Sequence, residues 1–99
     1  MICAAALFAF GCTSTPAKVD ANLSAVWKEY RELPDARALA VAGNPRGDRF
    51  VAGLSGGHAS SDEAAKSALR ECGERRHRMM MPHACKLYAV GDDVVWSGP

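Results

Sequence analysis

The sequence predicts an α+β domain with a mainly antiparallel four-stranded sheet, one alanine-rich helix packed on that sheet and a short N-terminal helix. Three observations lead to this prediction. Helical and strand patterns follow one another in the order helix, hairpin, helix, hairpin. Two turn sequences rich in glycine, asparagine and aspartate separate apolar runs of strand length. The longer helical segment begins with a capping box and is rich in alanine.

The chain of 99 residues is expected to have four parts. Residues 1–11 form a signal peptide, residues 12–19 a tether, residues 20–34 the N-terminal helix and residues 35–99 the α+β domain. A domain of this size has a thin core, because it buries only about 60% of the surface that its unfolded chain exposes. Such domains usually need a covalent or metal staple.

The N-terminal helix is predicted from one apolar face. Asp20 or Asn22 is expected to cap its start, and Pro34 ends it. Aromatic residues at helical spacing, and Trp96 at a strand end, are expected to anchor the core rather than to form a ligand platform. The apolar residues recur at spacings of three and four: Leu23, Val26, Trp27, Tyr30 and Leu33.

The two hairpins are predicted from apolar runs on either side of short turns. Ala38 and Ala40 occupy one face of the first strand, where small side chains allow a helix to approach closely. The expected turns are residues 43–48 and 91–93, and the expected strands are residues 37–41, 49–54, 85–90 and 94–96.

The long helix has the clearest boundary signal. Ser60 and Glu63 fit a capping box, and acidic residues in the first turn suit the positive end of the helix dipole. The helix is expected to end near Arg78, before Pro82. The stripe that meets the sheet comprises Ala65, Ala68, Leu69 and Cys72.

The start of the chain resembles the lipobox of bacterial lipoproteins. An apolar run closed by small residues precedes Cys12, and Ala9-Phe10-Gly11-Cys12 supplies the motif. The resemblance implies cleavage before Cys12, acylation of Cys12 with palmitate, and anchoring in the cell envelope facing the periplasm. Thr13 favours the outer membrane, because inner-membrane lipoproteins of many Gram-negative bacteria have aspartate there. The alternatives are an ordinary cleaved signal of a secreted or periplasmic protein, an uncleaved anchor and a buried core segment.

A second resemblance covers residues 38–96. A hairpin ending in a glycine-rich turn, an alanine-rich helix with one cysteine and an aromatic strand opened by a second cysteine resemble a group of small secreted bacterial domains of unknown function. That resemblance implies the fold and a disulfide between Cys72 and Cys85. The lipobox resemblance leads to the same pair, because Cys3 would leave with the signal peptide and Cys12 would carry lipid. The disulfide would contribute about 3 kcal/mol in the chain-entropy model.

Segment 72–85 also supports an alternative function, the binding of copper. Thioether, thiolate and imidazole ligands together select Cu(I). Zinc is a weaker alternative, because the spacing lacks the close cysteine pair of zinc fingers. The other interpretation is that the methionines fill a gap between helix and sheet and that the histidines are solvated. Beside the two cysteines, the residues concerned are His77, Met79, Met80, Met81 and His83.

No catalytic residue and no cofactor are predicted. His58 lies near Ser55, Ser60 and Ser61, which suggests a nucleophile beside a base, but a glycine turn and a helix cap also account for these residues. No phosphate-binding loop, Gly-x-Gly-x-x-Gly or His-Glu-x-x-His motif occurs.

Charge and location suggest the partners. The net charge of +1 argues against nucleic acid. The basic stretch 70–78 suits the negative pole of its helix, and it also suits contact with anionic lipid headgroups or cell-wall polymers. The sequence therefore predicts a structural or interaction module of the envelope, anchored by lipid and without catalysis.

Overall fold

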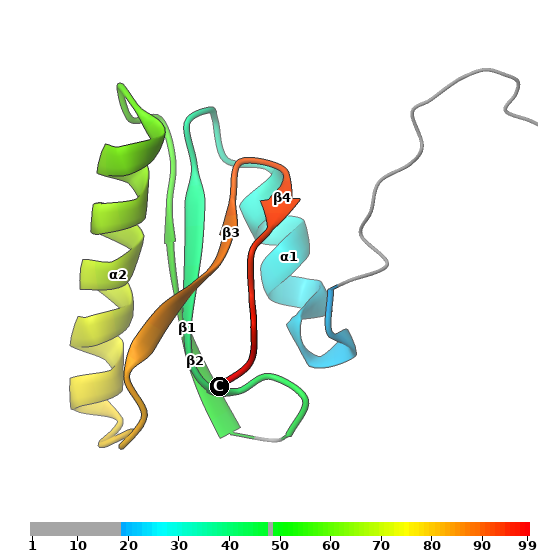
Figure 1. Ribbon diagram of the computed structural model, residues 1–99, viewed down its shortest axis with the longest axis vertical. Helices are drawn as coiled ribbons and strands as arrows, with labels where there is room; N and C mark the ends of the chain where they lie inside the picture. The colour runs from blue at the N-terminus through cyan, green and yellow to red at the C-terminus, as the bar shows by residue number, and fades with distance from the viewer. Residues whose placement is uncertain (1–18, 48) are drawn as a thin grey trace, which may run out of the picture.

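Four antiparallel strands in the order β2-β1-β3-β4 form the centre of the molecule (Figure 1). The structure is a computed structural model that describes residues 19–47 and 49–99. It confirms the predicted α+β class, with a short N-terminal helix and one longer helix. The elements are η3 (Ala21–Leu23), α1 (Ser24–Arg31), β1 (Ala38–Asn44), β2 (Arg49–Ser55), α2 (Ser61–Arg78), β3 (Cys85–Val90) and β4 (Asp93–Val94).

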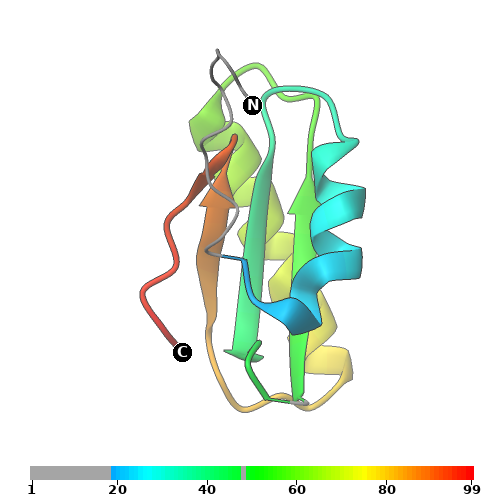
Figure 2. The ribbon, with the colours of Figure 1, turned by 90° about the vertical axis from the view of Figure 1, so that its right-hand side faces the viewer.

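Helices cover both faces of the sheet. Figure 1 shows α2 on one face and α1 on the other, with the chain after β4 running down on the α1 side. In Figure 2 the edge strand β2 lies beside α1, while α2 lies behind the sheet. The central strand β1 is buried from Ala38 to Gly43, since it has a strand on each side and a covered face above and below.

The two faces of β1 follow the alternation of side chains along a strand. One core cluster joins the alanines of β1 to Ala64, Ala68 and Cys72 of α2. The other joins Leu39 and Val41 to residues of the N-terminal helices and of β3. The predicted use of small residues under α2 is therefore confirmed.

Gly53 in β2 sets the distance between the sheet and α2. A Cβ atom at this position would overlap the backbone nitrogen of Cys72 and lie 2.5 Å from the carbonyl oxygen of Ala68. Both atoms are backbone, so a side chain at position 53 would force the helix away from the sheet. The same turn of α2 carries the disulfide between Cys72 and Cys85, whose Cα atoms lie 6.1 Å apart. The predicted pairing is confirmed.

The ends of α2 also match the prediction. The backbone N–H of Glu63 donates to the Ser60 hydroxyl oxygen at 3.2 Å, so Ser60 is the cap. The helix ends at Arg78, where Met79 is the C-cap residue.

The N-terminal helix differs from the prediction of one helix over residues 20–34. It is divided into η3 and α1, and it ends at Arg31. Asp20 occupies the N-cap position of η3, as expected, but neither its side chain nor that of Asn22 caps a helix. The Asn22 side chain instead donates to the carbonyl oxygen of Gly47, and a carboxylate oxygen of Asp20 accepts a hydrogen bond from the Tyr88 hydroxyl at 3.1 Å. Both side chains thus bond to residues that are distant in sequence, and not to the N–H groups at the helix start.

The bounds of three strands also differ from the prediction, and for β2 the difference is a single residue, because it ends at Ser55. β1 continues to Asn44 rather than ending at residue 41, because Asn44 still pairs with Arg49. β4 comprises residues 93–94 rather than 94–96, because the turn uses only Gly91 and Asp92 and pairing starts at Asp93.

Candidate functional site

A groove runs along the outer edge of β2, between α1 and the end of α2. Its volume is about 370 Å³, which is within the range of small ligand sites. Apolar side chains provide most of its wall, and two arginines stand at its rim. The lining residues are Val26, Phe50, Val51, Ala52, Arg75, Arg78 and Met79.

The two sides of the groove differ in chemistry. On the α1 side, Phe50 and Val26 pack against the core cluster that contains Tyr30 and Tyr88. On the α2 side, the last turns of the helix supply Arg75 and Arg78. The groove therefore has an apolar side and a cationic side, on opposite faces of the edge strand.

Arg75 and Arg78 of the groove, and the neighbouring Arg49, have no carboxylate partner among the described residues. Among the described residues, the ion pairs within 4 Å involve Arg37 and Arg46 only. Arg75 Nη1 donates instead to the carbonyl oxygen of Ala52 at 3.2 Å, and Arg49 Nη2 donates to the carbonyl oxygen of Met79 at 3.5 Å. Arg78 makes no side-chain hydrogen bond within residues 19–47 and 49–99. Among the described residues, Arg75 and Arg49 therefore bond to backbone carbonyl groups rather than to carboxylates.

The carbonyl of Ala52 faces away from the sheet. In an antiparallel pair, successive residues turn their N–H and C=O groups alternately toward and away from the partner strand. The Arg37 carbonyl accepts from Gly91 on the β3 side of β1, so even-numbered residues of β1 bond to β2. Their partners in β2 are odd-numbered, which leaves Phe50, Ala52 and Leu54 with outward backbone groups.

The segment with possible metal ligands is divided between core and surface. Met81 is 5% exposed and fills the core under α2, as the packing interpretation predicted. Met79 and Met80 are 62% and 83% exposed, so that interpretation is wrong for these two residues, which follow the helix end and point into solvent. His77 and His83 are both exposed, as expected.

The structure does not support the metal hypothesis in the described part of the chain. No group of three or more histidine, cysteine, aspartate or glutamate side chains there lies close enough together to hold a metal ion. Cys72 and Cys85 are joined to each other, and the His83 carbonyl accepts from Arg76 Nε at 2.6 Å. Of the set His77, Met80, Met81 and His83, three lie at the surface and Met81 lies in the core.

Ser55 and His58 do meet in the structure. The Ser55 hydroxyl oxygen lies within hydrogen-bond distance of His58 Nε2, and Ser55 is only 8% exposed. His58 also exchanges backbone hydrogen bonds with Ala36, at 3.3 and 3.5 Å. Within residues 19–47 and 49–99, no carboxylate bonds the imidazole to orient it, and Ser60 serves as the helix cap. The contact fixes the connection between β2 and α2.

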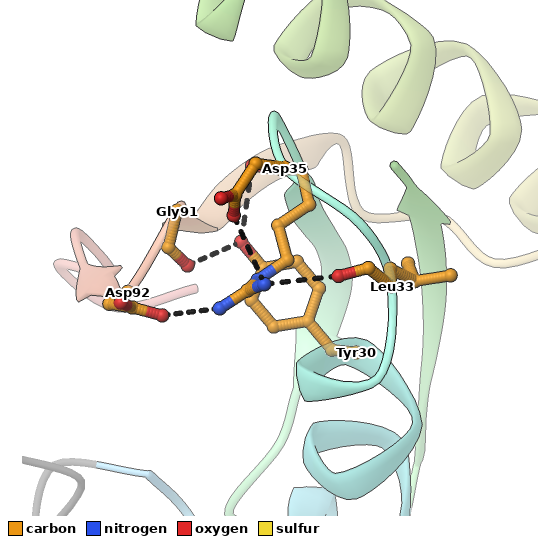
Figure 3. Close-up of polar contacts among 6 residues, drawn as sticks. Tyr30, Leu33, Asp35, Gly91 and Asp92 are labelled. Atoms are coloured by element: carbon orange, nitrogen blue, oxygen red, sulfur yellow. Dashed lines mark hydrogen bonds and ion pairs between the residues drawn. The ribbon is translucent and has the colours of Figure 1, made fainter. Parts of the chain in front are cut away.

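A second polar cluster surrounds Arg37 and was not found from the sequence. Its guanidinium donates to the Leu33 carbonyl oxygen at 3.0 Å, bonds to the carboxylates of Asp35 and Asp92, and lies 5.4 Å from the centre of the Tyr30 ring. Figure 3 shows these groups converging from the end of α1 and from the turn before β4. The cluster joins distant segments, and its members bond to one another.

Buried tyrosines anchor the α1 face. The Tyr30 hydroxyl donates to the Gly91 carbonyl oxygen at 2.7 Å (Figure 3). Burial raises the pKa of Tyr30 to about 12, although Arg37 opposes the shift. Burial likewise raises the pKa of Tyr88, whose hydroxyl bonds to Asp20. Trp96 and Trp27 are half-buried and pack against Tyr88 and Tyr30, with ring centres 5.4 and 5.2 Å apart, as core anchors.

The predicted lipidation site lies outside the described residues. Cys12, Cys3, the signal peptide and residues 12–18 of the tether all precede residue 19. Among the helices in the described ranges, none has both the length and the apolar character of a membrane span.

Fold and site together define a small disulfide-linked α+β domain with an arginine-rimmed groove at a sheet edge. Comparison with protein-family models, with curated proteins and with solved structures finds no match to this chain. The groove was not predicted. Arg75 and Arg78 were noted only as part of the basic stretch, because the edge position of β2 depends on strand order.

Proposed function

We propose that the protein is a lipid-anchored interaction module of the bacterial cell envelope, without catalysis of its own. The observation that carries this proposal is the disulfide between Cys72 and Cys85. Disulfides form and persist in exported proteins and are rare in reducing compartments. An exported chain whose sequence has a lipobox-like motif at Cys12 fits attachment to a membrane surface.

The groove along β2 supports the role of an interaction module. Its wall is apolar, its rim carries arginines without carboxylate partners among the described residues, and it is open enough for a partner to enter. The Tyr30 hydroxyl and the His58 imidazole bond inside structural clusters and do not line this groove. Binding is therefore the activity that this surface supports.

Membrane fractionation of Cys12→Ser tests the anchoring. The wild-type chain is expected in the membrane fraction, with added mass from acyl groups, and the variant in the soluble or periplasmic fraction. Cys3→Ser is the matched control and should fractionate like the wild type. Equal membrane association of the wild type and Cys12→Ser, with no acyl mass on either, would refute the lipid anchor.

A further inference from the structure

We propose that the groove binds an extended acidic polypeptide segment, which pairs with the free edge of β2 as a fifth strand. The inference rests on the proposed role as an interaction module and names the chemistry of its partner. The partner is a strand whose alternate residues are apolar and acidic.

The backbone of β2 provides the first part of the argument. Phe50, Ala52 and Leu54 direct their N–H and C=O groups away from β1, as the pairing register requires. An unpaired strand edge is a template for a further strand, and addition of a peptide strand is a common mode of recognition. The groove exposes this edge at Phe50 to Ala52, so the added strand pairs over a short length.

Arg75 protects this edge in the unbound protein. Its Nη1 atom donates to the Ala52 carbonyl oxygen at 3.2 Å, the place where a neighbouring strand would donate its N–H. Proteins commonly cover sheet edges with charged side chains to prevent uncontrolled pairing. An incoming strand replaces this hydrogen bond with its own N–H and releases the guanidinium toward the solvent side of the groove.

The side chains provide the second part of the argument. Side chains of an added strand alternate between the two faces of the sheet. Those on the α1 side meet Phe50 and Val26, which are apolar. Those on the α2 side meet Arg75 and Arg78, which no carboxylate within the described residues neutralises. Apolar residues on one side and carboxylates on the other complement both walls at once.

The same features favour a polypeptide over a lipid. An anionic lipid offers a charged group and acyl chains, but it has no regular row of N–H donors for the Ala52 carbonyl oxygen. Only a strand satisfies the charged rim, the apolar wall and the outward backbone groups together.

The test uses the full chain in neutral detergent and a short, N-acetylated peptide of alternating valine and glutamate that carries a fluorescent dye at its C-terminus. We expect a dissociation constant below about 1 mM by fluorescence anisotropy, weakening at high salt. A peptide with the same residues in two blocks, all valines before all glutamates, is the control and should bind about tenfold more weakly or not at all. No binding of the alternating peptide, or equal binding of both peptides, would overturn the proposal.

Variants locate the site. Arg75→Gln with Arg78→Gln should weaken binding of the alternating peptide by about tenfold or more, since two charge contacts are lost. Arg70→Gln is the matched control, because Arg70 is exposed on the same helix and does not line the groove. Equal affinities of the double variant and the wild type would place binding elsewhere and overturn the proposal.

Amide hydrogen exchange distinguishes strand pairing from attraction between charges alone. The amides of Phe50, Ala52 and Leu54 face outward, so pairing should slow exchange first at Phe50 and Ala52. Val51 and Gly53 already face β1 and should change little. Binding without slower exchange at Phe50 and Ala52 would show that no strand is added.

Dihexanoyl phosphatidylglycerol, below its micellar concentration, provides the lipid comparison. If this lipid binds with dependence on Arg75 and Arg78 while the alternating peptide does not bind, the groove is a lipid site and the strand proposal fails. These measurements do not depend on Cys12. Failure of peptide binding is thereby separate from failure of the lipid anchor.

Discussion

The two faces of the sheet are covered by helices in opposite ways. On the α2 face the side chains are small, from Ala38, Ala40 and Ala42 of β1 to Ala64 and Ala68 of the helix. The helix lies so close that Gly53 has no room for a Cβ atom, and a disulfide fixes it. At Gly53 the contact on this face is therefore backbone against backbone.

The α1 face has large side chains held by polar anchors. Tyr30 and Tyr88 are fully buried, and their hydroxyls bond to Gly91 and Asp20, which are far away in sequence. α1 has only 8 residues, too few for a stable helix on its own, so these contacts hold it in place. The difference shows that a long helix tolerates a smooth small-residue interface, whereas a short helix needs bulky anchors with specific hydrogen bonds.

Removal of the disulfide should have the largest effect on this comparison. Cys72→Ser with Cys85→Ser should lower the free energy of unfolding by about 3 kcal/mol, because the unfolded chain regains the freedom of the closed loop. Urea unfolding of the double variant and of wild type, each with and without reductant, measures the effect. Reductant should destabilise the wild type and leave the variant unchanged. Free thiols at positions 72 and 85 in untreated envelope protein would contradict the disulfide.

A methyl group at Gly53 should have the next largest effect. Gly53→Ala should cost about 2 kcal/mol, since the new Cβ meets backbone atoms of α2 that cannot move independently. Gly73→Ala is the matched control, and its effect on the free energy of unfolding should have the opposite sign. A Cβ at Gly73 meets nothing within 4 Å, and the substitution should stabilise α2 by about 0.5–1 kcal/mol. Equal effects of the two substitutions in urea unfolding would show that α2 does not rest on β2 as described.

The corresponding test of the α1 face is Tyr30→Phe. Loss of the hydroxyl, which bonds to the carbonyl oxygens of Gly91 and Arg37, should cost about 1.5 kcal/mol at neutral pH. The contacts of the ring remain, so the variant should fold. Urea unfolding measures the effect, and an unchanged aromatic circular dichroism spectrum shows that the variant is folded. If the stability did not change, the Tyr30 hydroxyl would not anchor the α1 face.

The pH dependence provides a second readout of Tyr30. The pKa is about 12 in the folded protein and about 10 in an unfolded chain, so the folded state holds this proton more tightly. The stabilisation that the protonated Tyr30 gives the folded state is complete below about pH 10, and it is lost as the pH rises toward about 12. Wild-type stability should therefore fall over this interval. The stability of Tyr30→Phe should fall less steeply with pH, and Tyr88, whose pKa is also raised, should contribute to the slope that remains.

The sequence predicts the α2 face better than the α1 face, for a physical reason. The capping box, and the small residues Ala38 and Ala40 on one strand face, are local signals, and they predicted α2 and its packing on the sheet. Asp20 was expected to cap a helix, yet it bonds to Tyr88, 68 residues away. Competition between a local and a distant partner depends on the complete fold.

The candidate groove shows the same limit. Arg75 and Arg78 are visible in the sequence as basic residues, but their meaning depends on β2 being an edge strand. That position follows from β1 pairing with both β2 and β3, and no local pattern specifies it. The cysteine pair was predictable without the strand order, because both resemblances lead to Cys72 and Cys85.

The smallest expected effect concerns how each helix begins. α2 has a side-chain cap, Ser60, whereas no side chain caps α1. Ser60→Ala should destabilise the protein by about 1 kcal/mol, because the Glu63 N–H loses its acceptor at the helix start. Ser61→Ala, one residue further on and exposed, is the control and should change stability little. If both substitutions have the same effect in urea unfolding, packing on the sheet alone determines where α2 begins, as it does for α1.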